Sequence, residues 1–494
     1  MTTSELMKAT NAPRNFMHSV PVVGALAIAA MLLSACSADR LEITNPNTPT
    51  VEGATSDPQS LQLQATGVLR RLRDGRGGFI STTGIFGRES FNYTPAEGRN
   101  TSDFLIGIAG ANRIDPAGFA NGNWGAQYLN LRDLFNLKNS LAASASITDA
   151  QKSAGLGFAK TLEGLELLYV LSTRDSLGIV VTIQADPTQL SPFVSRDSAY
   201  KYILTTLDEG NTALGNGGAT FPFTLHTGFA GFNTPTTFRQ FNRAIAARAA
   251  AYYATAGGGA TAWQRALTAL TASFINTAAS TRAALDVGVY HPYSGTAGDA
   301  INPLSQTNAN DLYAHPSIQT DAPTKADATL DNRYLAKIGT RASRQAPGGF
   351  GIASALGFNI YPTTAASIPI IRNEELILLR AEALLATGDK AGALTLINLI
   401  RTVSGGLAPS SLTAASPDND VLTELLLQKR YSLLLEGHRW VDARRYGRLA
   451  SLPLDISTGA SRHFVARVQP IPQAECLARA NAAAELFGPC ALQK

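Results

Sequence analysis

Glu436, His438 and Asp442 are the side chains of this 494-residue sequence whose types and spacing could do chemistry. They lie in one segment, EGHRWVDARRYG (436–447). A histidine between two carboxylates could serve as the general base of a hydrolase. The alternative is an ion-pair and hydrogen-bond cluster that fixes a helix end on its neighbours, because arginine and carboxylate groups pair with defined geometry. Such networks also occur without catalysis. We therefore favour a structural motif, with these members: Glu436, His438, Arg439, Trp440 and Asp442.

Other catalytic patterns do not stand out. The sequence has no nucleophile elbow, phosphate-binding loop or metalloprotease helix. His291 and His315 are too few for a zinc site of three or four protein ligands. Any two of the 37 acidic residues could mimic a glycosidase pair, so their presence alone indicates nothing. We predict that the protein is not an enzyme and has neither a metal site nor a cofactor.

Aromatic residues in two irregular stretches are candidates for ligand binding. An exposed aromatic face can stack on a sugar ring, while a few polar groups fix its orientation. The long stretch 284–368 is rich in Gly, Pro, Asn, Asp and Thr, and loops of this length are usually functional. The alternative is that each aromatic side chain anchors its loop to the core. The candidates are Phe91, Tyr93, Tyr290 and Tyr293.

The C-terminal region contains the clearest helical pattern. Apolar residues recur three and four positions apart over 373–387, which predicts an amphipathic helix. Gly388 suits the position after its end and Asp389 suits the N-cap of a second helix over 391–403. Ala381 and Ala393 would allow these two helices to approach closely, as in tetratricopeptide hairpins. The segment therefore predicts one αα-hairpin.

Further helices are expected along most of the chain, separated at 75–122 and 284–369 by irregular stretches with short strands. The alanine-rich segment before Gly257-Gly258-Gly259 predicts close helix packing. About four helical pairs at irregular spacing indicate a degenerate repeat array, and the fold class is mainly α. The other predicted helices are 56–73, a helix opened by Asn123-Trp124, 149–172, 195–215, 236–256, 261–278 and 421–435.

The N-terminus reads as an export signal. Lys8 and Arg14 precede an apolar run over 20–33, which is too short to be retained as a membrane span. Leu-Ser-Ala-Cys, ending at Cys36, resembles the bacterial lipobox, and diacylation of that cysteine would give a stable anchor. The alternative is an ordinary signal peptide with an incidental cysteine. No other stretch approaches the ~20 apolar residues that span a bilayer.

The two remaining cysteines and the net charge are less informative about structure and partners. An oxidising location permits a disulfide between Cys476 and Cys490, but two free thiols are an equal alternative. The net charge is +4, and the one basic concentration, over residues 70–76, has no interleaved aromatic residues. We do not expect nucleic acid as a partner.

Three motifs, in this order and at this spacing, resemble the C-terminal motifs of the SusD/RagB family: LLRAEALLATGD (378–389), EGHRWVDARRYG (436–447) and PIPQAE (470–475). Gln428 and Ser432 stand where that family often carries acidic residues, so part of its ion-pair network must be rebuilt or absent. The resemblance implies tetratricopeptide-like helical pairs and a loop-rich subdomain. It also implies a lipoprotein of the outer membrane, exposed at the cell surface, that delivers a nutrient, most often an oligosaccharide, to a SusC-like TonB-dependent transporter.

We divide the chain accordingly into a signal peptide (1–35), a lipid anchor and tether (36–55), a helical-repeat region with an irregular loop at 75–122 (56–283), a ligand-binding region (284–369) and the C-terminal motifs (370–494). Two other hypotheses stay open. A secreted hydrolase would require Glu436, His438 and Asp442 in one concave pocket. A scaffold for envelope assembly would require a loop region without a ligand cleft.

Overall fold

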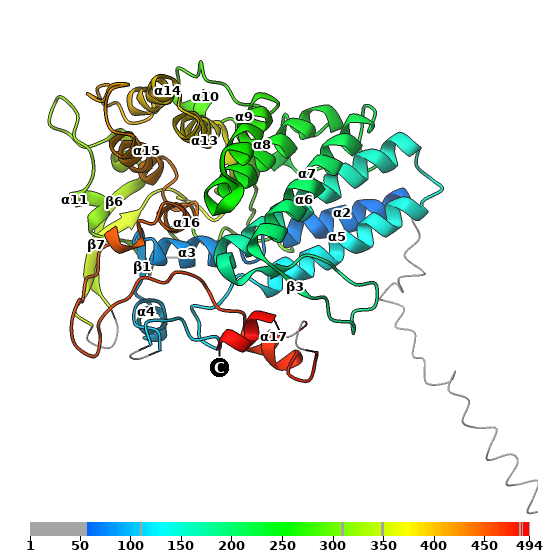
Figure 1. Ribbon diagram of the computed structural model, residues 1–494, viewed down its shortest axis with the longest axis horizontal. Helices are drawn as coiled ribbons and strands as arrows, with labels where there is room; N and C mark the ends of the chain where they lie inside the picture. Colours follow the sequence, from blue (N-terminus) through cyan, green and yellow to red (C-terminus); the bar gives the residue numbers. More distant parts are fainter. Residues whose placement is uncertain are drawn as a thin grey trace, which may run out of the picture. The chain divides into compact units, whose positions relative to one another are not determined.

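The computed structural model describes residues 57–108, 111–307, 311–346, 350–483, 486 and 488–493. Long helices dominate it, and those from α5 to α9 pack side by side in chain order (Figure 1). None of the helices in the described ranges is long and apolar enough to cross a membrane. The long helices are α2 (Pro58–Arg71), α5 (Gly125–Ala143), α6 (Asp149–Arg174), α7 (Arg196–Gly215), α8 (Pro235–Tyr253), α9 (Gly259–Thr271), α13 (Asn373–Ala386), α14 (Lys390–Val403) and α15 (Asp418–Ser432).

Small residues bring neighbouring helices close together. A Cβ atom added to Gly157 of α6 would lie 2.9 Å from the carbonyl oxygen of Gly210 on α7, so only glycine fits there. Alanines 244, 246, 247, 249, 250 and 251 of α8 are all buried. The close packing predicted for the alanine-rich segment is confirmed. Because α9 packs against both α8 and α13, the array continues into the C-terminal hairpin.

The hairpin of α13 and α14 follows the sequence pattern closely. Gly388 has a φ of +91°, the left-handed conformation that glycine adopts without strain. The Asp389 carboxylate accepts a hydrogen bond of 2.8 Å from the backbone N–H of Gly392, which caps α14. Ala381 and Ala393 are both fully buried. The predicted hairpin is confirmed, while α15 begins and ends three residues earlier than expected.

The irregular loop predicted at 75–122 is wrong in part, because it contains α3 (Arg76–Phe86) and α4 (Arg99–Leu105). Nine of the eleven residues of α3 are buried. A helix that is covered on nearly every side shows no contrast between an apolar and a polar face, so its period cannot be read from the sequence. Helix α3 packs against the short helix α16 (Arg439–Arg445).

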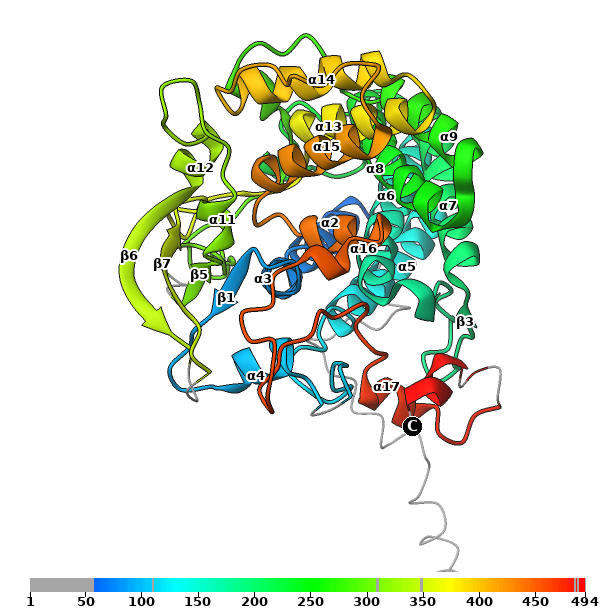
Figure 2. The same cartoon turned by 60° about the vertical axis from the view of Figure 1, so that its left-hand side comes forward.

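Short strands form the irregular part of the molecule (Figure 2). One antiparallel sheet has the order β1-β5-β7-β6, and Phe91 of β1 lies opposite Tyr313 of β5. Two further pairs are β2-β3 and β4-β8. The strands are β1 (Ser90–Asn92), β2 (Ile179–Val180), β3 (Phe193–Val194), β4 (Gly288–His291), β5 (Leu312–Ala314), β6 (Ile338–Gln345), β7 (Ala353–Phe358) and β8 (Ile368–Arg372). The short helices here are α10 (Arg282–Leu285), α11 (Ser317–Thr320) and α12 (Asn332–Lys337), and α17 (Gln473–Ala478) follows near the C-terminus.

The prediction of a mainly helical fold with an irregular, strand-bearing part is confirmed. Residues 55–494 form one compact unit, so the predicted regions 56–283, 284–369 and 370–494 share it. Strand β8 leads directly into α13, and β4 pairs with β8. The chain enters the C-terminal hairpin from the strand region, and this places the buried charges of α13 beside those of α15 and α16.

Candidate functional site

The segment 436–447 is built into the core. Glu436, His438 and Asp442 are all buried, and Trp440 is fully buried with its Nε1 donating a 2.6 Å hydrogen bond to the carbonyl of Ala466. The Arg439 Nε donates a 2.8 Å hydrogen bond to the carbonyl of Gly87, next to the end of α3. The three side chains proposed for a hydrolase therefore do not line a shared open pocket.

Glu436 has a partner at the end of a strand, and His438 has one on another helix. Arg372 at the end of β8 bridges Glu374 and Glu436, with 2.8 Å between its Nη2 and the Glu436 Oε1. The His438 Nδ1 lies 3.2 Å from the hydroxyl of Tyr252 on α8. Burial lowers the pKa of His438 well below its ordinary value, so the imidazole is neutral. These contacts fix α16 against α8 and α13.

A second cluster joins α13, α15 and α16, and we call it the Glu382 cluster. Lys429 lies 3.0 Å from Glu382 and 2.8 Å from Asp442. Arg445 pairs with the same two carboxylates, and the Tyr446 hydroxyl donates to Glu382 at 2.7 Å. Burial alone would raise the pKa of Glu382, but the charges of Arg445 and Lys429 lower it to about 2. Two cations face two carboxylates, so the Glu382 cluster is neutral.

The network is rebuilt around the two residues that depart from the family pattern. Arg333 of α12 donates a 2.7 Å hydrogen bond to the side-chain oxygen of Gln428 and a 2.9 Å hydrogen bond to the hydroxyl of Ser432. Its carboxylate partner is Asp331, two residues earlier in the chain. Ser432 in turn donates 2.6 Å to Glu374. The Asp331 carboxylate, which lies outside α15, thus supplies the negative charge that an acidic residue of α15 would otherwise provide.

The four aromatic candidates lie in the strand region, and three of them are buried. Phe91 stacks on Tyr93 with ring centroids 5.3 Å apart, and both are buried by the sheet. Tyr293 is buried beneath Arg73, whose guanidinium carbon lies 5.8 Å from the ring centroid. This burial agrees with loop anchoring and does not fit an exposed stacking surface. Tyr290 is partly exposed, and its hydroxyl donates to the carbonyl of Asp286.

The two histidines considered as metal ligands lie apart from any donor cluster. His291 is fully buried, and burial lowers its pKa well below the ordinary value. The His315 ring nitrogens lie 2.8 Å from the Ser317 hydroxyl and 3.1 Å from Asp455. Among the described residues, no group of three or more His, Cys, Asp or Glu side chains could hold a metal ion.

The last part of the chain forms one wall of a groove of about 450 Å³, which we call the Trp124 groove. Its other wall is the loop that leads into α5. Gln469 holds the two walls together, because its side chain donates 2.6 Å to the carbonyl of Ala120 and accepts 3.1 Å from Asn123. The groove is lined by Gly75, Asn121, Gly122, Asn123, Trp124, Gly125, Ala126, Gln127, Pro472, Ala474 and Glu475.

The Trp124 groove sets a few amide and carboxylate groups in a largely apolar lining. Asn123 has a φ of +60°, a left-handed conformation that asparagine tolerates better than most residues. The Trp124 Nε1 lies 3.4 Å from Glu475, which also pairs with Arg479 at 2.7 Å. The side-chain oxygen of Gln127 is buried and has no hydrogen-bond partner among the described residues. A buried carbonyl without a donor favours a ligand or water that supplies one.

A disulfide fixes the wall formed by α17. Cys476 in this helix is bonded to Cys490, with their Cα atoms 5.5 Å apart. Of the two alternatives left open by the sequence, the structure contains the bonded pair. Glu475 precedes Cys476 directly, so this bond restrains the helix that carries the groove carboxylate.

Sequence reasoning missed this groove. Trp124, at the start of the predicted helix, is only 8% exposed. The available signal was the polar run Asn121-Gly122-Asn123 immediately before a helix. Phe119, in the same loop, is 50% exposed. The guanidinium carbon of Arg99 lies 4.0 Å from the centroid of its ring. The lipidation candidate Cys36 lies outside the described residues.

Comparison with known proteins supports the resemblance to this family. Residues 359–485 match the model of the SusD family, and this range contains all three sequence motifs. The fold is similar to that of solved SusD superfamily proteins. The resemblance found in the sequence is therefore confirmed. No curated protein matches the chain.

SusD-like solved structures match over most of their length. A SusD superfamily protein from Bacteroides vulgatus is 15% identical, with a TM-score of 0.62, covering 85% of this chain and 97% of that one. NanU from B. fragilis is 13% identical, with a TM-score of 0.64, over 88% and 97% of the two chains. Surface glycan-binding protein A from Bacteroides thetaiotaomicron, in complex with laminarihexaose, is 13% identical, with a TM-score of 0.63, over 85% and 97%.

Proposed function

We propose that this SusD-like protein is a non-catalytic lipoprotein of the outer-membrane surface that binds an oligosaccharide and delivers it to a SusC-like TonB-dependent transporter. The fold supports a binding role, since a protein of the same fold is a surface glycan-binding protein whose structure holds laminarihexaose. The partners of Glu436, His438 and Asp442 support a structural role for these side chains. No observation favours the hydrolase or the scaffold over this proposal.

The observation that carries the binding site is the chemistry of the Trp124 groove. Sugar hydroxyls both donate and accept hydrogen bonds, so amides and carboxylates that keep free capacity are suitable partners. The buried Gln127 oxygen lacks a donor among the described residues. Asn123 donates through its amide nitrogen to Gln469, and no donor to its side-chain oxygen is found in the described part of the chain. The groove can therefore accept hydrogen bonds from a neutral ligand.

Phe119 supplies the exposed aromatic surface that the predicted ligand residues lack. It lies two residues before Asn121 in the loop that forms the groove wall. In the proposal, one sugar ring stacks on Phe119 while the next enters the Trp124 groove. Residues 284–369 remain a second proposed contact region, in which Tyr290 is the partly exposed aromatic candidate.

Titration calorimetry with laminarihexaose and a panel of other neutral oligosaccharides tests the site. We expect Phe119→Ala and Glu475→Gln each to weaken binding at least about fivefold, since a lost stacking or hydrogen-bonding contact costs about 1 kcal/mol. Glu209→Gln, on the exposed face of α7, is the matched control and should bind normally. Normal binding by both groove variants, with a loss in Tyr290→Ala, would move the site to the strand region.

Localisation and delivery need separate measurements. Cys36→Ala should release the folded protein from the membrane fraction, and its retention there would contradict the lipid anchor. A C-terminally tagged protein, purified from detergent-solubilised outer membrane, should bring down a large β-barrel transporter in near-equal amount. Purification without a barrel would contradict the delivery step while leaving glycan binding intact.

A further inference from the structure

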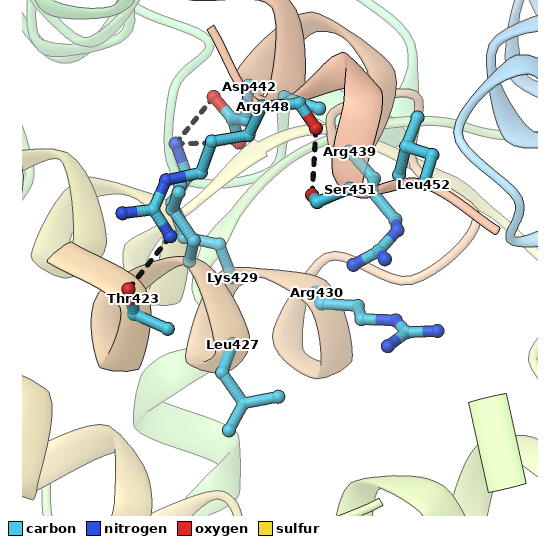
Figure 3. Close-up of a pocket in the computed structure, with 11 residues that line it drawn as sticks. Thr423, Leu427, Lys429, Arg430, Arg439, Asp442, Arg448, Ser451 and Leu452 are labelled. Carbon is cyan, nitrogen blue, oxygen red and sulfur yellow. Dashed lines mark hydrogen bonds and ion pairs between the residues drawn. The ribbon is translucent and has the colours of Figure 1, made fainter. Parts of the chain in front are cut away.

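A second cavity, of about 180 Å³, lies between α15, α16 and the turn that follows α16. We call it the arginine pocket, since three of its lining side chains are Arg430, Arg439 and Arg448 (Figure 3). Lys429 and Asp442 also reach its wall, but they pair with each other in the Glu382 cluster. Asp442 is the only acidic residue among the lining side chains, so the pocket carries an excess of positive charge.

Arg439 has the fewest partners of the three arginines. Its Nε donates to the carbonyl of Gly87, and it forms no ion pair with a carboxylate in the described part of the chain. Figure 3 shows its guanidinium group on the same side of the pocket as that of Arg430. Burial, followed by the charge of Arg430, lowers the pKa of Arg439 to about 10, although Glu89 acts in the opposite direction. An anion between the two arginines would relieve this repulsion.

Arg430 and Arg448 are held in place by other contacts. Arg430 is buried, and it donates 2.6 Å to Asp321 and 2.7 Å to the hydroxyl of Ser317. Its Nε is buried without a hydrogen-bond partner among the described residues. Arg448 donates 2.8 Å to the hydroxyl of Thr423, also a pocket residue, and forms no ion pair in the described ranges. The guanidinium groups are thus positioned before any ligand arrives.

Another arginine-rich cavity provides a contrast. It lies between α7, α8 and α9 and is larger, at about 580 Å³. There Asp208 accepts ion pairs from both Arg243, at 2.7 Å, and Arg265, at 2.5 Å, so a carboxylate of the protein already lies between the cations. In the arginine pocket no carboxylate among the described residues forms ion pairs with both Arg430 and Arg439, although the charges of Glu89 and Asp321 act on both.

From the cavity, its unpaired arginine and its apolar wall, we propose that the arginine pocket binds a small oxyanion, either a carboxylate or a phosphate monoester. Arginine recognises both groups through paired N–H donors. Leu426, Leu427 and Leu452 line the remaining wall and would contact the body of an organic anion. The volume corresponds to about six waters at the ~30 Å³ that each occupies in the liquid, which is enough for a monosaccharide acid or phosphate. This site is separate from the Trp124 groove and from the neutral ligand proposed there.

Titration calorimetry at constant ionic strength tests the pocket, with inorganic phosphate, glucuronate and neutral glucose as probes. We expect phosphate or glucuronate to bind with a Kd in the range of about 0.1–5 mM, and glucose not to bind there. Arg439→Gln should weaken binding at least about tenfold. Arg70→Gln, which removes an exposed arginine of α2 with 52% side-chain exposure, should leave the affinity unchanged.

The two oxyanions distinguish the source of the ligand. Binding of glucuronate alone assigns an acidic saccharide, and binding of phosphate alone assigns a phosphorylated compound. Arg448→Gln, which removes a partly exposed charge, repeats the test if Arg439→Gln does not fold. The proposal is overturned if neither oxyanion binds, or if Arg70→Gln weakens binding as much as the pocket variants. Binding of laminarihexaose should be unaffected by Arg439→Gln.

Discussion

The Glu382 cluster and the arginine pocket share α15 and α16 but differ in how their charges are balanced. Lys429 and Arg430 are consecutive in α15, and both are buried. Lys429 lies between two carboxylates that are also held by Arg445. Arg430 lines the same cavity as Arg439, and its one carboxylate partner among the described residues, Asp321, has a half-exposed side chain. The difference shows that neighbouring residues in a dense group of charges can differ in surroundings, with Lys429 neutralised inside the core and Arg430 paired at the edge of a cavity.

The largest expected effect comes from breaking the neutral cluster. Glu382→Ala should destabilise the fold by roughly 3–5 kcal/mol, because it leaves Lys429 and Arg445 buried with only one carboxylate between them. Urea denaturation followed by circular dichroism measures this loss. The wild type should also lose stability as the pH falls from about 4.5 through 2, since the pKa of Glu382 is lowered to about 2 and its charge contributes only above that range.

A buried carboxylate beside the arginine pocket should respond to pH in the opposite sense. Burial raises the pKa of Glu89 to about 7, against the opposing charges of Arg439 and Arg430. The folded state therefore favours the neutral form, and stability present below about pH 4.5 is lost as the pH rises through 7. Glu89→Gln should remove this loss and gain on the order of 2 kcal/mol relative to wild type at pH 8. A difference between the two proteins that stays constant from pH 5 to 8 would contradict the assignment.

Arg439→Gln should lower the free energy of unfolding by only about 1 kcal/mol, because the substitution removes one hydrogen bond, to the carbonyl of Gly87. A pair between Arg439 and Glu436 or Asp442 would raise this loss to several kcal/mol. In the structure these carboxylates instead form ion pairs with Arg372, Lys429 and Arg445. A loss as large as that of Glu382→Ala, in the same denaturation experiment, would show that Arg439 belongs with the structural charges.

The smallest effect is expected at an exposed ion pair. Lys160 and Glu209 join α6 and α7 at 2.6 Å, but the side chain of Glu209 is 52% exposed. Lys160→Ala should change the free energy of unfolding by less than about 1 kcal/mol, because solvent screens the pair. This variant sets the baseline against which the two buried regions are compared, and a loss of more than about 2 kcal/mol would undermine the ranking by burial.

Much of the helical fold could be predicted from local patterns. The α13–α14 hairpin has a clear period, a glycine at its turn and an aspartate at the next N-cap, and these are interactions within a few residues. Helix α3 could not be found in this way, because burial on nearly all sides removes the contrast between its faces. The sequence favours a structural role for the motif 436–447, but the partners of its side chains could not be found from a single sequence.

The site depends on contacts between distant parts of the chain. Gln469 meets Asn123 across 346 positions, and the Arg439 Nε meets Gly87 across 352. No periodicity encodes such pairs, so neither the Trp124 groove nor the arginine pocket was predictable. The burial of three of the four aromatic candidates has a related cause, since Phe91 is covered by residues brought to it through the pairing of β1 with β5.

The adjacency of Lys429 and Arg430 also limits how the length of this chain can change. Successive residues of an α-helix point about 100° apart around its axis. A single residue inserted in α15 ahead of Lys429 would turn every following side chain by that angle, taking Lys429 away from Glu382 and Arg430 away from Asp321. Substitutions on this helix can be absorbed individually, whereas an insertion or deletion would disturb both surroundings at once. Gaps in an alignment of relatives should therefore fall outside residues 418–442.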